Sequence, residues 1–67
     1  MKLMVWTDVL CDYTCGMIVA LAPSLETALH LTDRPSVRED MVRVDPEVTE
    51  LGEVDAEPRV WFVFGGG

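Results

Sequence analysis

The amino-terminal segment alternates its side chains in the way that β-strands do. Lys2–Val9 is rich in β-branched and aromatic residues, which predicts a strand over these positions. Because successive side chains of a strand point to opposite faces of the sheet, the two faces consist of Leu3, Val5, Thr7 and Val9, and of Lys2, Met4, Trp6 and Asp8. Both sets contain large apolar residues. We expect the face with Leu3 and Val5 to be the buried one.

The next two elements are predicted from an apolar run and a helix cap. Met17–Ala22 is apolar throughout and ends at Pro23, which is typical of a strand covered on both faces. The connecting Leu10–Gly16 contains turn-forming residues and predicts a hairpin loop. Ser24 can cap a helix over Ser24–Thr32, in which Leu25, Ala28 and Leu29 share one face.

The second half of the chain predicts two further strands. Ser36–Val42 matches a capping box and predicts a short helical turn. Strands are expected at Glu47–Leu51 and Val60–Phe64, separated by an acidic turn at Gly52–Pro58. The chain is therefore expected to form one α+β domain over residues 1–67, in the order β-β-α-β-β, with a flexible glycine tail at 65–67. We expect a four-stranded, mainly antiparallel sheet in which the first and last strands pair, with one principal helix. The predicted core consists of Leu3, Val5, Ile18, Ala20, Leu25, Ala28, Leu29, Val60, Phe62 and Phe64.

One short helix can cover only one face of this sheet, although both faces are apolar. We therefore expect Trp6, Trp61 and Val63 to form a partly exposed face used for a homodimer or a partner contact. The alternative is that the 33–46 segment folds across this face.

Net charge narrows the function classes more than any motif does. Twelve acidic and five basic residues give a charge of −7 in 67 residues, which disfavours direct binding to nucleic acid or to an anionic membrane. The charge should attract basic surfaces, such as nucleic-acid-binding sites of other proteins; the alternative is that it only maintains solubility. A chain this short leaves little material for a substrate cleft, so we do not expect an enzyme.

Two cysteines, Cys11 and Cys15, are too few for a disulfide scaffold, which normally has four or more in a secreted chain this short. A zinc site needs four ligands, and His30 is the only other soft ligand in the sequence. We expect free loop thiols, with a reversible disulfide as the alternative, and no metal or other cofactor. Neither a signal peptide nor a membrane span is recognisable, which predicts a cytoplasmic protein.

The acidic residues are concentrated in one stretch. Six carboxylates lie within Asp45–Glu57, with no basic residue among them. If extended, Glu53, Asp55 and Glu57 would project at intervals of about 6.6 Å, close to the spacing of phosphates along one nucleic-acid strand. The predicted partner-binding residues are Glu47, Glu50, Glu53, Asp55 and Glu57, with Asp8, Asp12 and Tyr13 of the hairpin loop as a second contact region. The alternative is a solvated acidic turn.

Two resemblances suggest families. The opening KLMVWTDVLCDYTCGMIVALAPS, the acidic middle and the ending VWFVFGGG resemble small acidic phage and prophage proteins, among them anti-CRISPR proteins that mimic DNA. This resemblance implies a non-enzymatic inhibitor that occupies a basic nucleic-acid-binding site of a CRISPR effector in the host cytoplasm. The length, the element order and the Gly-Gly terminus are also similar to ubiquitin-like β-grasp sulfur carriers. That alternative implies a C-terminal carboxylate at Gly67 that becomes adenylated.

Overall fold

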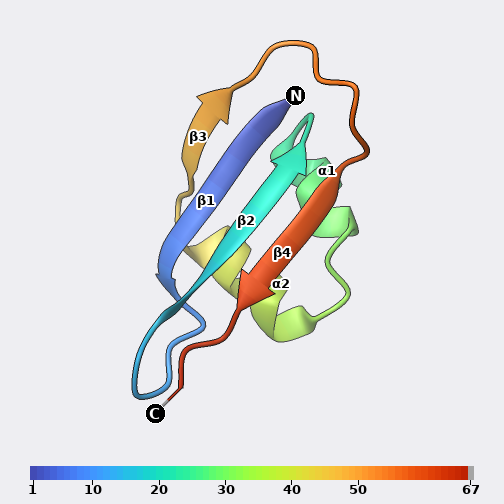
Figure 1. Ribbon diagram of the computed structural model, residues 1–67. Coiled ribbons are helices and arrows are strands. Elements are labelled where there is room, and N and C mark those ends of the chain that lie inside the picture. The colour runs from blue at the N-terminus through green and yellow to red at the C-terminus, as the bar shows by residue number, and fades with distance from the viewer. Residues whose placement is uncertain (67) are drawn as a thin grey trace.

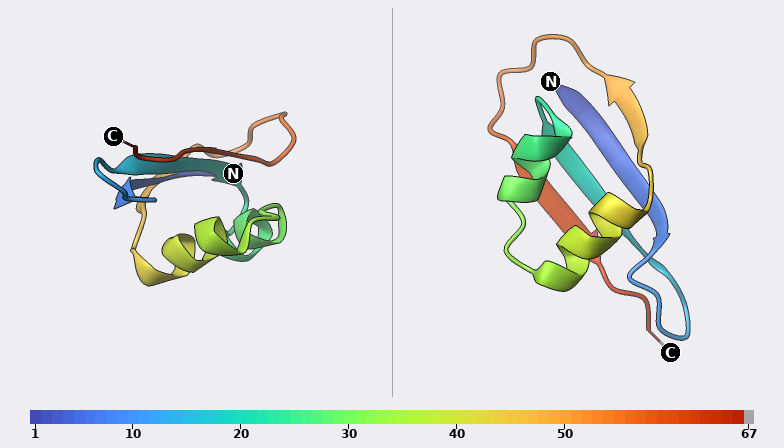
Figure 2. Two further views of the ribbon diagram at one scale, coloured as in Figure 1. Left: turned by 90° about the horizontal axis from the view of Figure 1, so that it is seen from below. Right: turned by 180° about the vertical axis from the view of Figure 1, so that it is seen from behind.

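A four-stranded antiparallel sheet and two helices make up the fold. The computed structural model describes residues 1–66. The elements follow in the order β1 (Lys2–Val9), β2 (Gly16–Ala22), α1 (Leu25–His30), α2 (Pro35–Arg43), β3 (Glu47–Glu50) and β4 (Arg59–Val63). Both helices lie on the same face of the sheet (Figures 1 and 2). The predicted α+β class and the four strands are thus confirmed, whereas the single principal helix is replaced by two helices.

The strands are ordered β3-β1-β2-β4 in the sheet. The two strands of the first hairpin are central, and all three neighbouring pairs are antiparallel. The predicted pairing of the first and last strands is therefore wrong, because β2 lies between β1 and β4. This order puts β3 and β4 at opposite edges of the sheet (Figure 1).

The Trp6 indole fixes which face of β1 is buried. Its side chain is fully buried, and its Nε1–H donates to the carbonyl oxygens of Met41, at 3.1 Å, and Val44, at 2.9 Å. These carbonyls belong to the last turn and the cap of α2, where the helix itself supplies no hydrogen-bond donor. The Trp6 side chain therefore fills the space under α2 and provides the hydrogen-bond donor for two carbonyl groups at the C-terminal end of that helix.

The core lies between the sheet and the two helices. Met4 and Trp6 of β1 contribute to it together with Ile18, Ala20 and Ala22 of β2, and the helices add Ala28, Val37 and Met41. Among the predicted core residues, Ile18, Ala20 and Ala28 are buried, and Leu29 and Val60 pack against the core. Leu3 and Val5 are only partly buried and lie on the other face, so the predicted inward face of β1 is wrong.

The remaining predicted core residues are exposed. Leu25, Phe62 and Phe64 keep 39%, 36% and 44% of their surface accessible. Phe62 is opposite Ile18 and so lies on the helical face, but β4 is an edge strand that the helices cover incompletely (Figure 2).

A β-bulge at Asp8 changes the alternation along β1. Asp8 has a φ of 56°, in the left-handed region, and the register with β2 shifts between Thr7 and Val9. Simple alternation along β1 would place Val9 on the face away from Trp6. The extra residue instead brings Val9 to the buried face that Trp6 occupies. Asp8 itself remains exposed to solvent.

The predicted helix caps are correct for α1 and wrong for α2. The Ser24 hydroxyl accepts a hydrogen bond from the backbone N–H of Thr27, as predicted, although α1 ends at His30 rather than Thr32. The second helix begins at Pro35, and Arg34 occupies the cap position without a side-chain hydrogen bond. Ser36 is therefore not the cap of this helix, because proline already fits the first helical position.

The face opposite the helices is left uncovered by the rest of the described chain, residues 1–66. The 33–46 segment packs on the same side as α1, so it does not cover this second face (Figure 2). We call this surface the open face; its apolar residues are Leu3, Val5, Met17, Val19, Leu21, Trp61 and Val63. Trp61 and Val63 are 45% and 64% exposed, as predicted, but Trp6 is not part of this face because its indole points under α2.

Replacing Trp6 tests the role of the indole. Trp6→Phe removes the N–H that satisfies two carbonyls and leaves a small void, so the free energy of unfolding should fall by about 3 kcal/mol. The matched control is Trp61→Phe, at an exposed site, which should change it by less than about 1 kcal/mol. Denaturant unfolding followed by circular dichroism measures both. Equal effects of the two substitutions would contradict this role of Trp6.

Candidate functional site: an acidic arc along one edge of the sheet

The carboxylates between α2 and β4 follow the margin of the molecule. Glu47 and Glu50 lie on β3, at the outer edge of the sheet, and the chain then crosses the end of the sheet to reach β4 (Figure 1). We call the carboxylates of this stretch the acidic arc; its members are Asp45, Glu47, Glu50, Glu53, Asp55 and Glu57. All six side chains are exposed, so the arc is available to a partner.

The arc is anchored at one point. The amino group of Met1 donates to the carbonyl of Gly52, at 3.0 Å, and lies 3.5 Å from the Glu50 carboxylate. Gly52 has a φ of 73°, a left-handed conformation that glycine adopts without strain, and it turns the chain away from β3. Beyond it, the 51–58 segment forms no strand and bends at Glu53 and Ala56. The evenly spaced row of Glu53, Asp55 and Glu57 therefore does not form.

Most of the basic side chains lie outside the acidic arc. Arg34, Arg38 and Arg43 belong to α2 or its cap, and Arg34 stacks over the rings of Phe62 and Phe64 at 5.6 Å from each centroid. Arg59 lies over the Trp61 ring at 5.3 Å. Lys2 is the cross-strand neighbour of Glu50. Lys2 beside Glu50 and Arg59 two residues after Glu57 thus adjoin the arc, whereas the other three basic residues belong to α2 and its cap.

The second predicted contact region lies at the far end of the sheet. Asp8, Asp12 and Tyr13 belong to the hairpin between β1 and β2, and Tyr13 is 86% exposed. Lys2 pairs with Glu50 at one end of β1, whereas Asp8 is at the other end. The eight residues of β1 span about 25 Å. A single partner site can contact the arc and the hairpin loop together only if it extends along the whole sheet.

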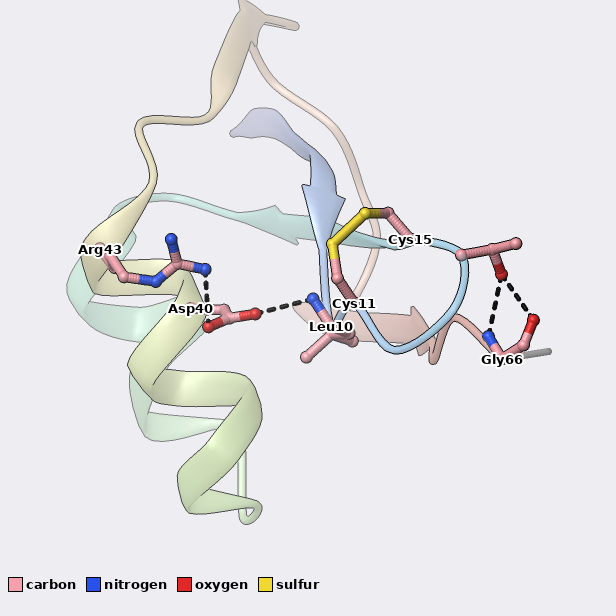
Figure 3. The surroundings of a disulfide bond; sticks show 7 residues. Leu10, Cys11, Cys15, Asp40, Arg43 and Gly66 are labelled. Carbon is pink, nitrogen blue, oxygen red and sulfur yellow. Dashed lines mark hydrogen bonds and ion pairs between the residues drawn. A yellow bond between two sulfur atoms is a disulfide. The ribbon is translucent and has the colours of Figure 1, made fainter.

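A disulfide closes the hairpin loop. Cys11 and Cys15 are bonded to each other, so the prediction of free thiols is wrong and the alternative holds (Figure 3). The loop is also tied to α2, because the backbone N–H of Leu10 donates to Asp40 Oδ2 at 2.7 Å, and Arg43 contacts the other oxygen of that carboxylate at 3.0 Å. Leu10 has a φ of 52°, a left-handed conformation that these contacts hold in place.

The glycine tail is hydrogen-bonded to the same loop. The N–H of Gly65 donates to the carbonyl of Leu10. The N–H of Gly66 donates to the Thr14 hydroxyl, which in turn donates to the Gly66 carbonyl; Figure 3 draws both bonds of Gly66. The sequence predicts a flexible tail, but Gly65 and Gly66 have these fixed partners. Gly67, the reactive residue of the sulfur-carrier hypothesis, lies outside the described residues.

Among residues 1–66, no group of three or more His, Cys, Asp and Glu side chains is arranged to hold a metal ion. No helix within the same range is long and apolar enough to cross a membrane. Comparisons of the chain with protein-family models, with curated proteins and with solved structures found no match.

Sequence reasoning missed two features near these sites. The Asp40 contact joins residues thirty positions apart, and no local pattern indicates it. The open face was predicted correctly for Trp61 and Val63 but wrongly for Trp6, in whose place Leu3 and Val5 lie on that face. Alternation shows only that Leu3 and Val5 face away from Met4 and Trp6, and does not decide which set faces the helices.

Acid titration tests the Asp40 link. The hydrogen bond from Leu10 lowers the pKa of Asp40 below its ordinary value of 3.8, burial opposes this shift, and Arg43 lowers the pKa further. The carboxylate thus stabilises the fold at neutral pH, and this contribution is lost as pH falls from about 4 through the folded-state pKa. Asp40→Asn keeps an oxygen acceptor but removes the charge, so its unfolding free energy should depend less on pH in this window. Glu39→Gln, at an exposed neighbour, should retain the wild-type dependence; identical profiles for all three proteins would contradict the link.

A pair of alanine substitutions tests the docked tail. A Cβ at Gly65 would overlap the backbone carbonyl of Thr14, whereas a Cβ at Gly66 would meet open space. Gly65→Ala should therefore lower the free energy of unfolding by about 1–3 kcal/mol and speed amide exchange in the hairpin loop. Gly66→Ala should leave both unchanged. If Gly65→Ala also has no effect, the tail does not depend on this contact.

Proposed function

We propose that this chain is a non-enzymatic binding protein that uses the acidic arc to occupy a basic, nucleic-acid-binding surface of another protein. The observation that supports this most is the segregation of charge. Six exposed carboxylates follow one edge and one end of the sheet, while three of the five basic residues belong to α2 and its cap.

Held together, like charges repel one another and destabilise the compact state, and a basic partner removes this cost by neutralising them. Carboxylates that only maintain solubility would not have to be concentrated along one margin of the molecule. A basic site built for phosphate groups provides the positive potential that such a margin complements. The bends at Glu53 and Ala56 favour recognition through local charge density over a regular phosphate-like spacing.

The resemblance to anti-CRISPR proteins gives this proposal a concrete target. Under it, the chain inhibits a CRISPR effector in the host cytoplasm by excluding nucleic acid from one of its subunits. The arc provides the main contact, and Asp8, Asp12 and Tyr13 take part only where the target site extends along the sheet. The sulfur-carrier alternative requires a tail that is free to enter an enzyme, and the hydrogen bonds of Gly65 and Gly66 with the loop disfavour it.

Charge reversal on the arc tests the proposal. A pull-down from a bacterial lysate, followed by mass spectrometry, identifies the target, and displacement of labelled DNA or RNA from it then measures binding. Reversal of Glu53, Asp55 and Glu57 to Lys should weaken binding at least about 100-fold, because like charges then face a basic groove.

The matched control reverses Glu26, Asp33 and Glu39, which are exposed and belong to the helical layer. It changes the net charge by the same amount and should weaken binding far less. Equal losses in the two triple variants would show that only net charge matters. A ternary complex of this protein, its target and nucleic acid would exclude competitive occupation.

A further inference from the structure

The β4 strand has an unpaired edge and is apolar on both faces. Its inner edge pairs with β2 from Leu21↔Arg59 to Met17↔Val63, and no strand among residues 1–66 pairs with its outer edge. Trp61 and Val63 are exposed on the open face, and Phe62 is exposed on the helical face. The unpaired edge of this five-residue apolar strand is a template for pairing with another strand unless charge, proline or a bulge blocks it.

The two edges of the sheet differ in how they are protected. The β3 edge contains Glu47 and Glu50 in four residues, so a second copy placed there would bring carboxylates together. The β4 edge contains Arg59 as its single charged residue, followed by Val60, Trp61, Phe62 and Val63. Self-association is therefore blocked by charge at β3 and left open at β4.

We infer that two copies of this chain associate through their β4 strands, antiparallel and edge to edge, into a continuous eight-stranded sheet. The net charge of −7 favours this arrangement over others, because it places the two β3 edges at the outer ends of the combined sheet, about 34 Å apart. Stacking two open faces would bring the charged margins of both copies close together. The inference does not depend on the proposed function; if both hold, the dimer presents two acidic arcs.

Full overlap of the five-residue strand defines the register. Trp61 then lies opposite Trp61 of the second copy, and Arg59 lies opposite Val63 at both ends of the pair. Paired residues of antiparallel strands point to the same face, so the open faces become continuous. The contact is smaller than the interface of about 1,600 Å² that a stable complex typically buries, so we expect dissociation constants of about 10–500 μM.

Two opposite charges at Val63 test this register. Val63 is 64% exposed, so both substitutions should leave the monomer folded, as circular dichroism can verify. Val63→Lys places two like-charge pairs with Arg59 in the dimer and should weaken association about tenfold. Val63→Glu places two opposite-charge pairs and should retain or strengthen it. The double variant Val63→Lys/Arg59→Glu restores opposite charges and should associate like the wild type.

Sedimentation equilibrium from about 10 μM to 1 mM measures the association, and amide exchange at low and high concentration locates it. Protection of the β4 amides that increases with concentration supports the edge pairing. A wild-type protein that remains monomeric at about 1 mM overturns the inference. So do equal losses for Val63→Lys and Val63→Glu, which would indicate stacking of the open faces, and a dimer whose β4 amides gain no protection.

Discussion

The hydrogen bonds from the Trp6 indole to the end of α2 are the constraint on which the rest of the structure depends. They bring Met4 and Trp6 to the helical face, and the pleat then requires Leu3 and Val5 to face the other way. The bulge at Asp8 lets Val9 rejoin the core despite this alternation. With α1 and α2 on one side, the molecule has one packed face and one open apolar face (Figure 2).

The strand order separates two kinds of surface that would interfere with each other if they were adjacent. Because β1 and β2 are central, the acidic β3 and the apolar β4 occupy opposite edges (Figure 1). Edge strands expose unpaired backbone groups, and charge is one means of preventing unwanted pairing. Glu47 and Glu50 have this effect at β3 and also belong to the acidic arc. One group of carboxylates can thus repel a second copy and attract a basic partner.

Local features of this fold could be predicted from the sequence, whereas its long-range arrangement could not. The Ser24 cap and the strands β1 and β2 were located correctly, because they depend on residues that are neighbours in the chain. The buried face of β1 was predicted wrongly because Leu3/Val5 and Met4/Trp6 are equally apolar, and a hydrogen bond to residues 35 and 38 positions away decides between them. The disulfide and the Asp40 contact likewise depend on how the hairpin loop folds. Among the candidate site residues, the carboxylates are exposed as expected, but the separation of the arc from Asp8, Asp12 and Tyr13 follows from the antiparallel register alone.

Whether the acidic arc or the open face binds the partner is the central question, and the dependence of affinity on salt answers it most directly. Binding between opposed charges weakens as salt is added, because screening and counterion exchange both oppose it. Apolar contacts through Trp61 and its neighbours are largely insensitive to moderate salt or strengthen with it. Measured with the captured partner over a range of sodium chloride concentrations, the logarithm of the affinity should fall steadily with the logarithm of salt. An affinity that stays constant or rises with salt would contradict the role of the acidic arc and assign binding to the open face.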